Sequence, residues 1–325
     1  MEKKACRKRN KKEKKGKKLV KIIFFGTANI SKYFLENISD KHKVVSVVTM
    51  CDKPVGRSNK IKAPAIKEYA IEQKIPYIQV DKFNNDIIQK IKDYNADVGV
   101  VVSFGKIIPK EVFSSPRYGC FNIHFSLLPK YRGAAPVQQA LIDGNTKTGV
   151  TAFCIEEGLD TGDIIKEESI IIDINDNMET LSNKLSLLGA KMIIEELPKI
   201  INGTNNRIPQ DNNKASYVGL IKREDEHLDF NTNAINIYNK VRALAPSPLA
   251  NFILDDVEYK ISKCEIDNIN GNIGEIIAED KTSFTIGCLD KAIKVTEIKP
   301  IGKKIMSVQD FKNGYHDKLV GKVVK

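Results

Sequence analysis

LVKIIFFG, residues 19–26, is the stretch that decides the fold of this chain. A nearly continuous apolar run of this length, ended by a glycine, predicts a strand that is buried on both faces. The run VVSVVT (44–49) predicts a second buried strand. Between them, residues 29–38 carry apolar side chains at helical spacing, namely Ile30, Phe34, Leu35 and Ile38. A strand, a helix and a strand in this order indicate a parallel sheet covered by helices.

The same alternation continues along the chain. Residues 84–95 read as a helix, 97–103 and 119–125 as strands, and 178–197 as a long helix with one apolar side. Residues 50–63 between the second strand and Pro64 are polar and predict a long loop, and Pro64 opens another helix. We therefore predict an α/β fold with a doubly wound, mainly parallel sheet.

The composition changes at INGTNNRIPQDNNK (201–214), which is rich in Asn, Gly and Pro and marks a linker. A helix at 233–244 and several short β-type runs separated by turn residues follow, and they predict a small barrel or sandwich. We accordingly divide the chain into a basic disordered tail (1–18), a first domain (19–203), a linker (204–222) and a C-terminal domain (223–325).

Composition restricts the class of protein. Of the 325 residues, 42% are apolar and 29% are charged, which is ordinary for a soluble globular protein. The six cysteines are scattered without a CxxC pair, so neither a disulfide framework nor a zinc site is indicated. No apolar run approaches the roughly 20 residues needed to cross a bilayer. We expect a soluble protein of the cytoplasm.

The net charge of +11 comes mostly from one short segment. Residues 1–18 hold eleven Lys or Arg against Glu2 and Glu13, which leaves the other 307 residues nearly balanced. A tail of this kind is able to hold nucleic acid by counterion release. A solvated, disordered extension is the interpretation that we favour. A start of translation near Leu19 or Val20 is a further alternative, so the tail carries no functional argument.

The most informative motif is GCFNIHFSLLPKYRG at residues 119–133. Asn122 and His124 are two residues apart in a predicted strand, so their side chains share one face. The segment GLDTGD (158–163) places Asp160 in a turn bracketed by glycines. An amide donor, a titratable imidazole and a carboxylate that converge on one point are the groups that acyl transfer needs.

Seven segments together resemble the methionyl-tRNA formyltransferase family. They are IIFFGT (22–27), CDKPVGR (51–57), VVSFGKIIP (101–109), GCFNIHFSLLPKYRGAAPVQQALIDG (119–144), TGVTAFCIEEGLDTGDII (148–165), VRALAPSP (241–248) and IGKKIMSVQDF (301–311). The resemblance implies a Rossmann-like domain followed by a barrel of the oligonucleotide-binding (OB) type. It also implies transfer of the formyl group of 10-formyltetrahydrofolate to the α-amino group of methionyl initiator tRNA, without a metal. Nothing in the sequence indicates an obligate dimer, so we expect a monomer.

The resemblance assigns roles to individual residues. Asn122 and His124 would donate hydrogen bonds to the formyl oxygen, and Asp160 would orient the imidazole. The residues expected to line the folate site are Phe104, Gly105, Ser126, Leu127, Leu128 and Pro129. Those expected to contact tRNA are Lys53, Arg57, Lys60, Lys62, Lys303 and Lys304. For Arg132 two roles stay open, a partner of a substrate carboxylate or phosphate and a buried structural ion pair.

Three other classes of function share parts of this pattern. A dinucleotide-dependent oxidoreductase lacks its fingerprint, because the glycine that follows Gly26 is Gly56. A non-catalytic nucleic-acid-binding module would leave the Asn, His and Asp motif without a purpose. A formyltransferase that acts on a sugar nucleotide or on glycinamide ribonucleotide, or a formyl-folate hydrolase, would keep the chemistry and change the acceptor.

Overall fold

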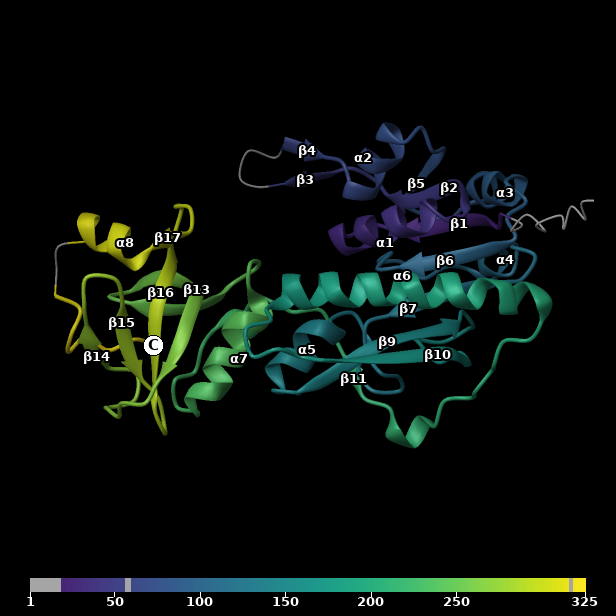
Figure 1. Ribbon diagram of the computed structural model, residues 1–325. Helices are drawn as coiled ribbons and strands as arrows, with labels where there is room; N and C mark the ends of the chain where they lie inside the picture. Colours follow the sequence, from purple (N-terminus) through teal and green to yellow (C-terminus); the bar gives the residue numbers. More distant parts are fainter. Residues whose placement is uncertain (1–18, 56–59, 316–317) are drawn as a thin grey trace, which may run out of the picture.

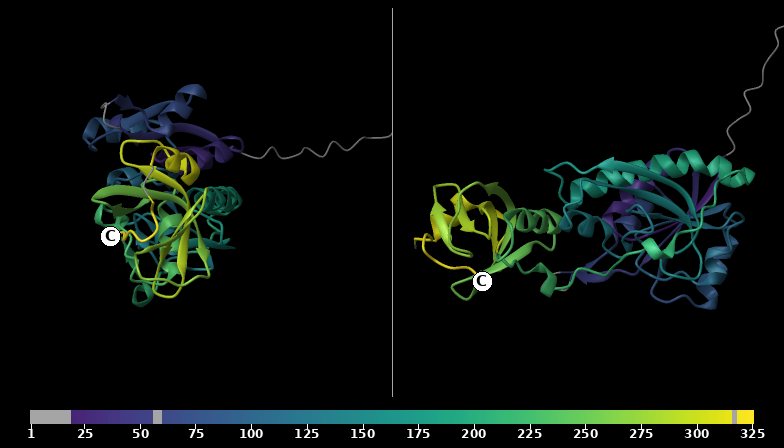
Figure 2. Two further views of the ribbon diagram at one scale, coloured as in Figure 1. Left: turned by 90° about the vertical axis from the view of Figure 1, so that its left-hand side faces the viewer. Right: turned by 90° about the horizontal axis from the view of Figure 1, so that it is seen from below.

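The structure is a computed structural model that describes residues 19–55, 60–315 and 318–325. The predicted tail at 1–18 lies outside the described residues. Two bodies lie side by side and give the molecule an elongated shape (Figures 1 and 2). Within the described ranges, no helix has the length and apolar character that a membrane crossing requires.

The N-terminal domain is built on a seven-stranded sheet with the order β10-β9-β7-β6-β1-β2-β5. The pairs from β5 to β7 are parallel, whereas β9 runs antiparallel to both β7 and β10. The strands are β1 (Lys21–Gly26), β2 (Lys43–Met50), β5 (Tyr77–Val80), β6 (Val98–Val102), β7 (Cys120–His124), β9 (Lys147–Cys154) and β10 (Ile164–Ile171). The predicted mainly parallel sheet is confirmed.

Helices cover both faces of this sheet, as a doubly wound fold requires. On β1, Phe24 belongs to one core cluster together with Phe34 and Leu185, and Phe25 belongs to the cluster on the other face with Ile91. This alternation explains why the first strand is apolar at nearly every position. The helices are α1 (Asn29–Ser39), α2 (Ala65–Glu72), α3 (Asn85–Asp93), α4 (Lys110–Phe113), α5 (Pro136–Ile142) and α6 (Met178–Asn202).

The segment at 50–63, predicted to be a loop, contains a short hairpin. Its strands are β3 (Lys53–Val55) and β4 (Lys60–Lys62), and they pair antiparallel. Asp52 fixes the root of the hairpin, because its carboxylate accepts hydrogen bonds from Lys67 Nζ at 2.7 Å and Gln79 Nε2 at 2.6 Å. The prediction was wrong at these two strands because backbone pairing holds them and neither has an apolar face that a pattern would reveal.

The C-terminal domain is an antiparallel sheet with the order β12-β13-β16-β15-β14, and β17 pairs with β16. The last residues of the chain join its two edges, since Lys325 exchanges backbone hydrogen bonds with Ile253 while Lys322 and Val324 bond Ile276 and Gly274. Closure of the edges indicates a barrel rather than a sandwich. The strands are β12 (Ala250–Leu254), β13 (Val257–Asp267), β14 (Ile276–Glu279), β15 (Phe284–Gly287), β16 (Ala292–Pro300) and β17 (Met306–Ser307).

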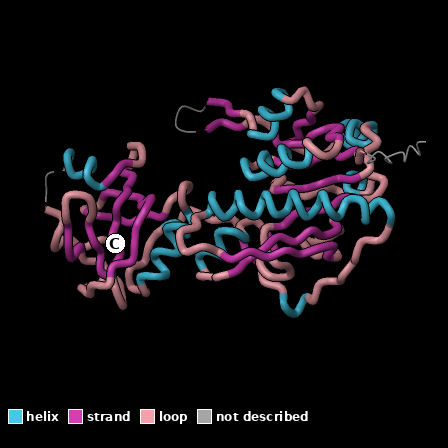
Figure 3. The backbone as a smooth tube through the Cα atoms, viewed as in Figure 1, coloured by secondary structure: helices cyan, strands magenta, loops and turns pink. Residues whose placement is uncertain are grey.

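Two helices belong to this domain, α7 (Ala234–Leu244) and α8 (Val308–Gly314). The predicted linker returns across the N-terminal domain before it reaches them (Figure 3). It carries the short helix η1 (Asn212–Lys214) and the strand β11 (Tyr217–Val218), which pairs with β8 (Arg132–Gly133). A second short helix, η2 (Glu224–Glu226), lies just beyond its predicted end. The part of the segment up to Val218 is therefore packed on the N-terminal domain, whereas η2 is held to the barrel by the ion pairs of Glu226 with Lys260 and of Arg223 with Glu258.

Candidate active site

Strand β7 carries Asn122 and His124 to the carboxyl edge of the sheet. It lies between β6, to which it is parallel, and β9, to which it is antiparallel. The neighbouring side chains Phe121 and Ile123 are buried in the core, and His124 is itself only 6% exposed. The alternation predicted from the sequence is present, because residues two apart on a strand share a face.

Asp160 lies against both of these side chains. Asn122 Nδ2 is 3.5 Å from Asp160 Oδ1, and His124 Nδ1 is 3.7 Å from Asp160 Oδ2. The backbone N–H of Gly133 donates to Asp160 Oδ2 at 2.8 Å. The three residues predicted to be catalytic thus meet at one place, although Asp160 lies 36 positions after His124 in the chain.

The geometry around His124 determines which ring nitrogen carries a proton. Nε2 lies 2.8 Å from the carbonyl oxygen of Tyr131, which only accepts hydrogen bonds, so Nε2 must donate. Tyr131 has φ of +59°, a left-handed conformation uncommon for a non-glycine residue. Because Nε2 is engaged in this way, Nδ1 is the nitrogen that faces Asp160.

The loop that carries Asp160 is held in place by a residue from another segment of the chain, Gln210. Asp160 has φ of +53°, and such left-handed residues persist where the surroundings stabilise them. Gln210 Nε2 donates to the carbonyl oxygens of Asp160 at 2.9 Å and Gly162 at 2.8 Å. Sequence reasoning missed Gln210, because a glutamine in a polar linker has no local pattern that marks it.

Arg132 holds Gln210 in turn. Its guanidinium is 1% exposed and donates to Gln210 Oε1 from Nε at 3.1 Å and from Nη2 at 2.7 Å. Its other acceptors are Asn212 Oδ1 and the hydroxyl of Tyr217. Among the described residues no carboxylate hydrogen-bonds this arginine, so the buried ion pair left open above is not found. Arg132 instead orders the segment that holds the Asp160 loop.

Gly133 is required by close packing. Its φ is +117°, and a Cβ built on it would lie 2.2 Å from the carbonyl oxygen of Val218. Any side chain here would force β8 and β11 apart. Since the N–H of Gly133 also donates to Asp160, such a change would displace the carboxylate as well.

The predicted folate residues lie at adjacent strand ends. Phe104 and Gly105 follow β6, and Ser126–Pro129 follow β7. The Phe104 ring packs on Phe25 in the core, and the hydroxyl of Ser126 donates to the carbonyl of Lys130. The side chains of Phe104 and Ser126 therefore stabilise the fold. Gly105 has φ of +82°, and the space that a Cβ would occupy there is open.

The predicted tRNA residues fall in two places. Lys53 and Lys62 are exposed on the β3–β4 hairpin, and the backbone of Lys60 lies in β4. Arg57 lies outside the described residues. Lys303 and Lys304 are exposed in the turn between β16 and β17. That turn and the hairpin project to the same side of the molecule (Figure 1).

A hollow of about 210 Å³ opens at the opposite edge of the sheet, at the beginning of β7. Its lining includes Tyr118, Cys154 and Arg207. None of the predicted site residues lines it, so it is separate from the meeting point of Asn122, His124 and Asp160. The part of the chain that the structure describes contains no cluster of three or more metal-ligating side chains.

Two family models match this chain. Residues 17–197 match the model described as "Formyl transferase", and residues 220–316 match "Formyl transferase, C-terminal domain". Among curated proteins, a methionyl-tRNA formyltransferase of Staphylococcus epidermidis is 40% identical over 307 residues, which cover 94% of this chain and 99% of that protein. A methionyl-tRNA formyltransferase of Staphylococcus aureus is 37% identical over 308 residues, with the same two coverages.

Solved structures share the fold. HypX from Aquifex aeolicus, in complex with tetrahydrofolic acid, superposes with a TM-score of 0.65 at 15% identity and covers 95% of this chain and 51% of that one. An N-formyltransferase from Helicobacter canadensis, in complex with folinic acid and dTDP-3-aminofucose, gives 0.64 at 24% identity and covers 85% of this chain and 99% of that one.

Proposed function

Because this chain belongs to the methionyl-tRNA formyltransferase family, we propose that it transfers the formyl group of 10-formyltetrahydrofolate to the α-amino group of methionyl initiator tRNA. The observation that carries the proposal is the convergence of Asn122, His124 and Asp160 at the carboxyl end of β7. Ligands of open α/β sheets bind at this edge. The open space beside Gly105, at the end of the neighbouring strand, supports the placement of the folate there.

The proposed chemistry is an acyl transfer between two nitrogen atoms. An α-amino group titrates near ~7.7–8.0, so a neutral amine is available for attack at neutral pH. The new C–N bond forms at the formyl carbon, the bond to the folate nitrogen breaks, and the proton that the amine loses passes through His124 to the departing folate nitrogen. As the formyl oxygen gains negative charge, Asn122 Nδ2 donates to it, and His124 donates from Nδ1 once the ring holds the proton of the amine. Both bonds stabilise the transition state.

Asp160 has two tasks in this proposal. Its carboxylate faces Nδ1 of His124, where it stabilises the imidazolium that forms when the ring takes up the proton of the amine. The carbonyl of Tyr131 keeps the other ring nitrogen fixed, so the ring cannot rotate away. Gln210 and Arg132 act only through the loop backbone, which makes them positioning residues.

The function is tested by direct assay of the purified protein. We expect formyl transfer from 10-formyltetrahydrofolate to methionyl initiator tRNA, little transfer to methionyl elongator tRNA, and slow folate hydrolysis when tRNA is omitted. Transfer to an amino sugar nucleotide, or hydrolysis that is independent of tRNA, would contradict the proposal and favour another acceptor.

For tRNA contact we propose the hairpin residues Lys53, Arg57, Lys60 and Lys62 together with Lys303 and Lys304. Residues 291–325 hold nine Lys against Glu297, Asp310 and Asp317, an excess suited to a phosphate backbone. The hairpin would meet the acceptor stem, where a terminal unpaired base pair is easily separated.

We expect Lys303→Glu with Lys304→Glu to raise KM for tRNA about tenfold. Loss of two phosphate contacts should lower the salt dependence of binding by about two in log–log slope, because each contact releases roughly one counterion. KM for folate should not change. The matched control is Lys90→Glu with Lys92→Glu, which removes two exposed lysines from α3. An equal loss in the control, or an unchanged salt slope, would speak against this face.

We also propose that the protein is a cytoplasmic monomer. In this proposal residues 19–203 hold the chemistry, 204–222 connect and support it, and 223–325 bind tRNA. The packing of Gln210 and β11 on the N-terminal domain supports the assignment of the connecting segment to the active site.

A further inference from the structure

Helix α7 belongs to the C-terminal domain by sequence but packs into both domains. Its residues Ile237, Val241 and Leu244 are part of the C-terminal core, whereas Ala243 is part of the core of the N-terminal domain. Its Asn239 Nδ2 lies 2.8 Å from the position that a Cβ of Gly144 would occupy, just after α5. The helix is therefore the element through which the two domains are connected.

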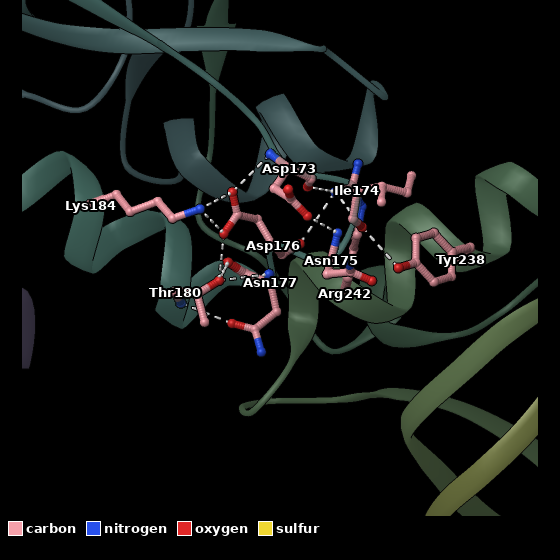
Figure 4. A network of polar contacts seen from close by, with 9 residues as sticks. All are labelled: Asp173, Ile174, Asn175, Asp176, Asn177, Thr180, Lys184, Tyr238 and Arg242. Carbon is pink, nitrogen blue, oxygen red and sulfur yellow. Dashed lines mark hydrogen bonds and ion pairs between the residues drawn. The ribbon is translucent and has the colours of Figure 1, made fainter.

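Arg242 on this helix reaches into the N-terminal domain (Figure 4). Its Nη1 lies 3.1 Å from the carbonyl oxygen of Asp173 and 3.3 Å from those of Ile174 and Asp176. Its Nε donates to Asn239 Oδ1 at 3.0 Å, which fixes the guanidinium on its own helix. The residue is only 8% exposed, so these carbonyls replace the water that would otherwise solvate the cation.

Tyr238 adds a second hydrogen-bonding side chain between the two domains. Its hydroxyl donates to the carbonyl oxygen of Ile174 at 2.8 Å, and its ring lies 5.6 Å from the guanidinium carbon of Arg242. Both side chains thus hydrogen-bond to one turn, residues 173–176, between β10 and α6. These hydrogen bonds resist rotation of α7 about its own axis, because the bonds of both side chains would have to break together.

The turn is itself anchored to α6 (Figure 4). The carboxylate of Asp176 is 3% exposed and bonds Lys184 Nζ at 2.7 and 2.8 Å and the hydroxyl of Thr180 at 3.0 Å. Burial by itself would raise the pKa of Asp176, but the bonds from Lys184, the backbone of Asp173 and Thr180 outweigh it and lower the pKa below its ordinary value. The acceptors of Arg242 are therefore held rigidly on the N-terminal domain.

We propose that Arg242 is a positioning residue that fixes the orientation of the barrel relative to the active site. The inference rests on the proposed function, because tRNA must touch Lys303 and Lys304 while its 3′ end reaches His124. Two linked contacts with one tRNA raise its affinity only when the geometry of the protein allows both contacts to form at once. Arg242 does not touch the reacting atoms. It determines whether a tRNA that is held by the barrel reaches the active site.

The test is Arg242→Met, which keeps the apolar stem of the side chain and removes its donors. We expect kcat/KM for methionyl initiator tRNA to fall about 10–100-fold as simultaneous contact is lost. Binding of 5-formyltetrahydrofolate, and the rate with a methionyl ester of a short CCA oligonucleotide that does not reach the barrel, should stay within twofold. Small-angle X-ray scattering of the full chain should show a wider distribution of interdomain distances.

Lys240→Met is the matched control, because Lys240 lies on the same helix and donates to the carbonyl of His227 within the C-terminal domain. It should leave the scattering curve unchanged and kcat/KM within a few-fold. If Arg242→Met fails to fold, Arg242→Lys keeps the charge but has a single nitrogen, which cannot bond Asn239 and the three carbonyls together. It should give a several-fold loss with tRNA and none with the short acceptor.

Two outcomes would overturn the proposal. One is an unchanged scattering curve for the folded Arg242 variant, and the other is an equal loss with the short acceptor and with tRNA, as a damaged active site would produce. Failure of the proposed function has a different signature. In that case the wild-type protein would not formylate initiator tRNA at all, whereas the scattering comparison would still report on the domain orientation.

Discussion

His124→Ala should lower kcat for formyl transfer by about 10²–10⁴, because the variant loses the group proposed to take up a proton and to donate to the formyl oxygen. The imidazole lies 3.7 Å from Asp160 and is bonded at Nε2 by the carbonyl of Tyr131, so no neighbouring side chain can replace it. Folate binding should change little, since the ring is proposed to lie against the backbone at Gly105 and not against the imidazole. Single-turnover kinetics with saturating tRNA measure this loss directly.

His227→Ala is the control for this substitution. Its Nδ1 lies 3.2 Å from Asn251 Oδ1 in the C-terminal domain, far from β7 in the sequence and in the fold. We expect its kcat to stay within a few-fold of the wild-type value. If His124→Ala were no worse than His227→Ala, the proton-transfer role would have to be abandoned.

The second large effect is expected for Asp160→Asn, on the order of 10²–10⁴ in kcat, as when an orienting carboxylate beside a catalytic histidine is replaced by its amide. The substitution keeps the size of the side chain and an oxygen that can accept from Gly133 N. It removes the negative charge that faces Nδ1 of His124, so the imidazolium loses its stabilisation. The fold should be retained, and circular dichroism and the melting temperature will show whether it is.

Asp163→Asn is the matched control, because Asp163 lies in the same turn and its backbone carbonyl accepts from Cys154 N. The substitution leaves that backbone bond in place, and we expect kcat within a few-fold of the wild-type value. Comparable losses in both variants would mean that the turn as a whole, rather than the carboxylate of Asp160, matters for the reaction.

The pairing of Asn122 with His124 was predictable because it depends on a local rule. Side chains two apart on a strand share a face whatever the rest of the chain does. The buried strands were predictable for a similar reason, since their apolar pattern lies in consecutive residues of the chain. The β3–β4 hairpin was not predictable, because its strands are only three residues long and its root depends on Asp52 meeting Lys67 and Gln79.

Arg132 and Gln210 show where local reasoning stops. The sequence left two roles open for Arg132, a partner of a substrate anion and a buried ion pair. The structure surrounds it with neutral acceptors that come from 78 to 85 residues further along the chain. Gln210 stands in a stretch that reads as a linker, yet it supports the left-handed backbone of Asp160. Neither contact involves a pattern of charges or of apolar residues.

The sequence by itself determined the doubly wound α/β domain, the β-rich second domain and the pair of side chains on β7. Only the tertiary structure decided how Asp160 is held, which nitrogen of His124 is free to face it, and how Arg242 joins the two domains. The physical reason is the nature of the acceptors. Gln210, His124 and Arg242 all bond backbone carbonyl oxygens, which every residue possesses, so their partners become identifiable only when the folded chain brings them within reach.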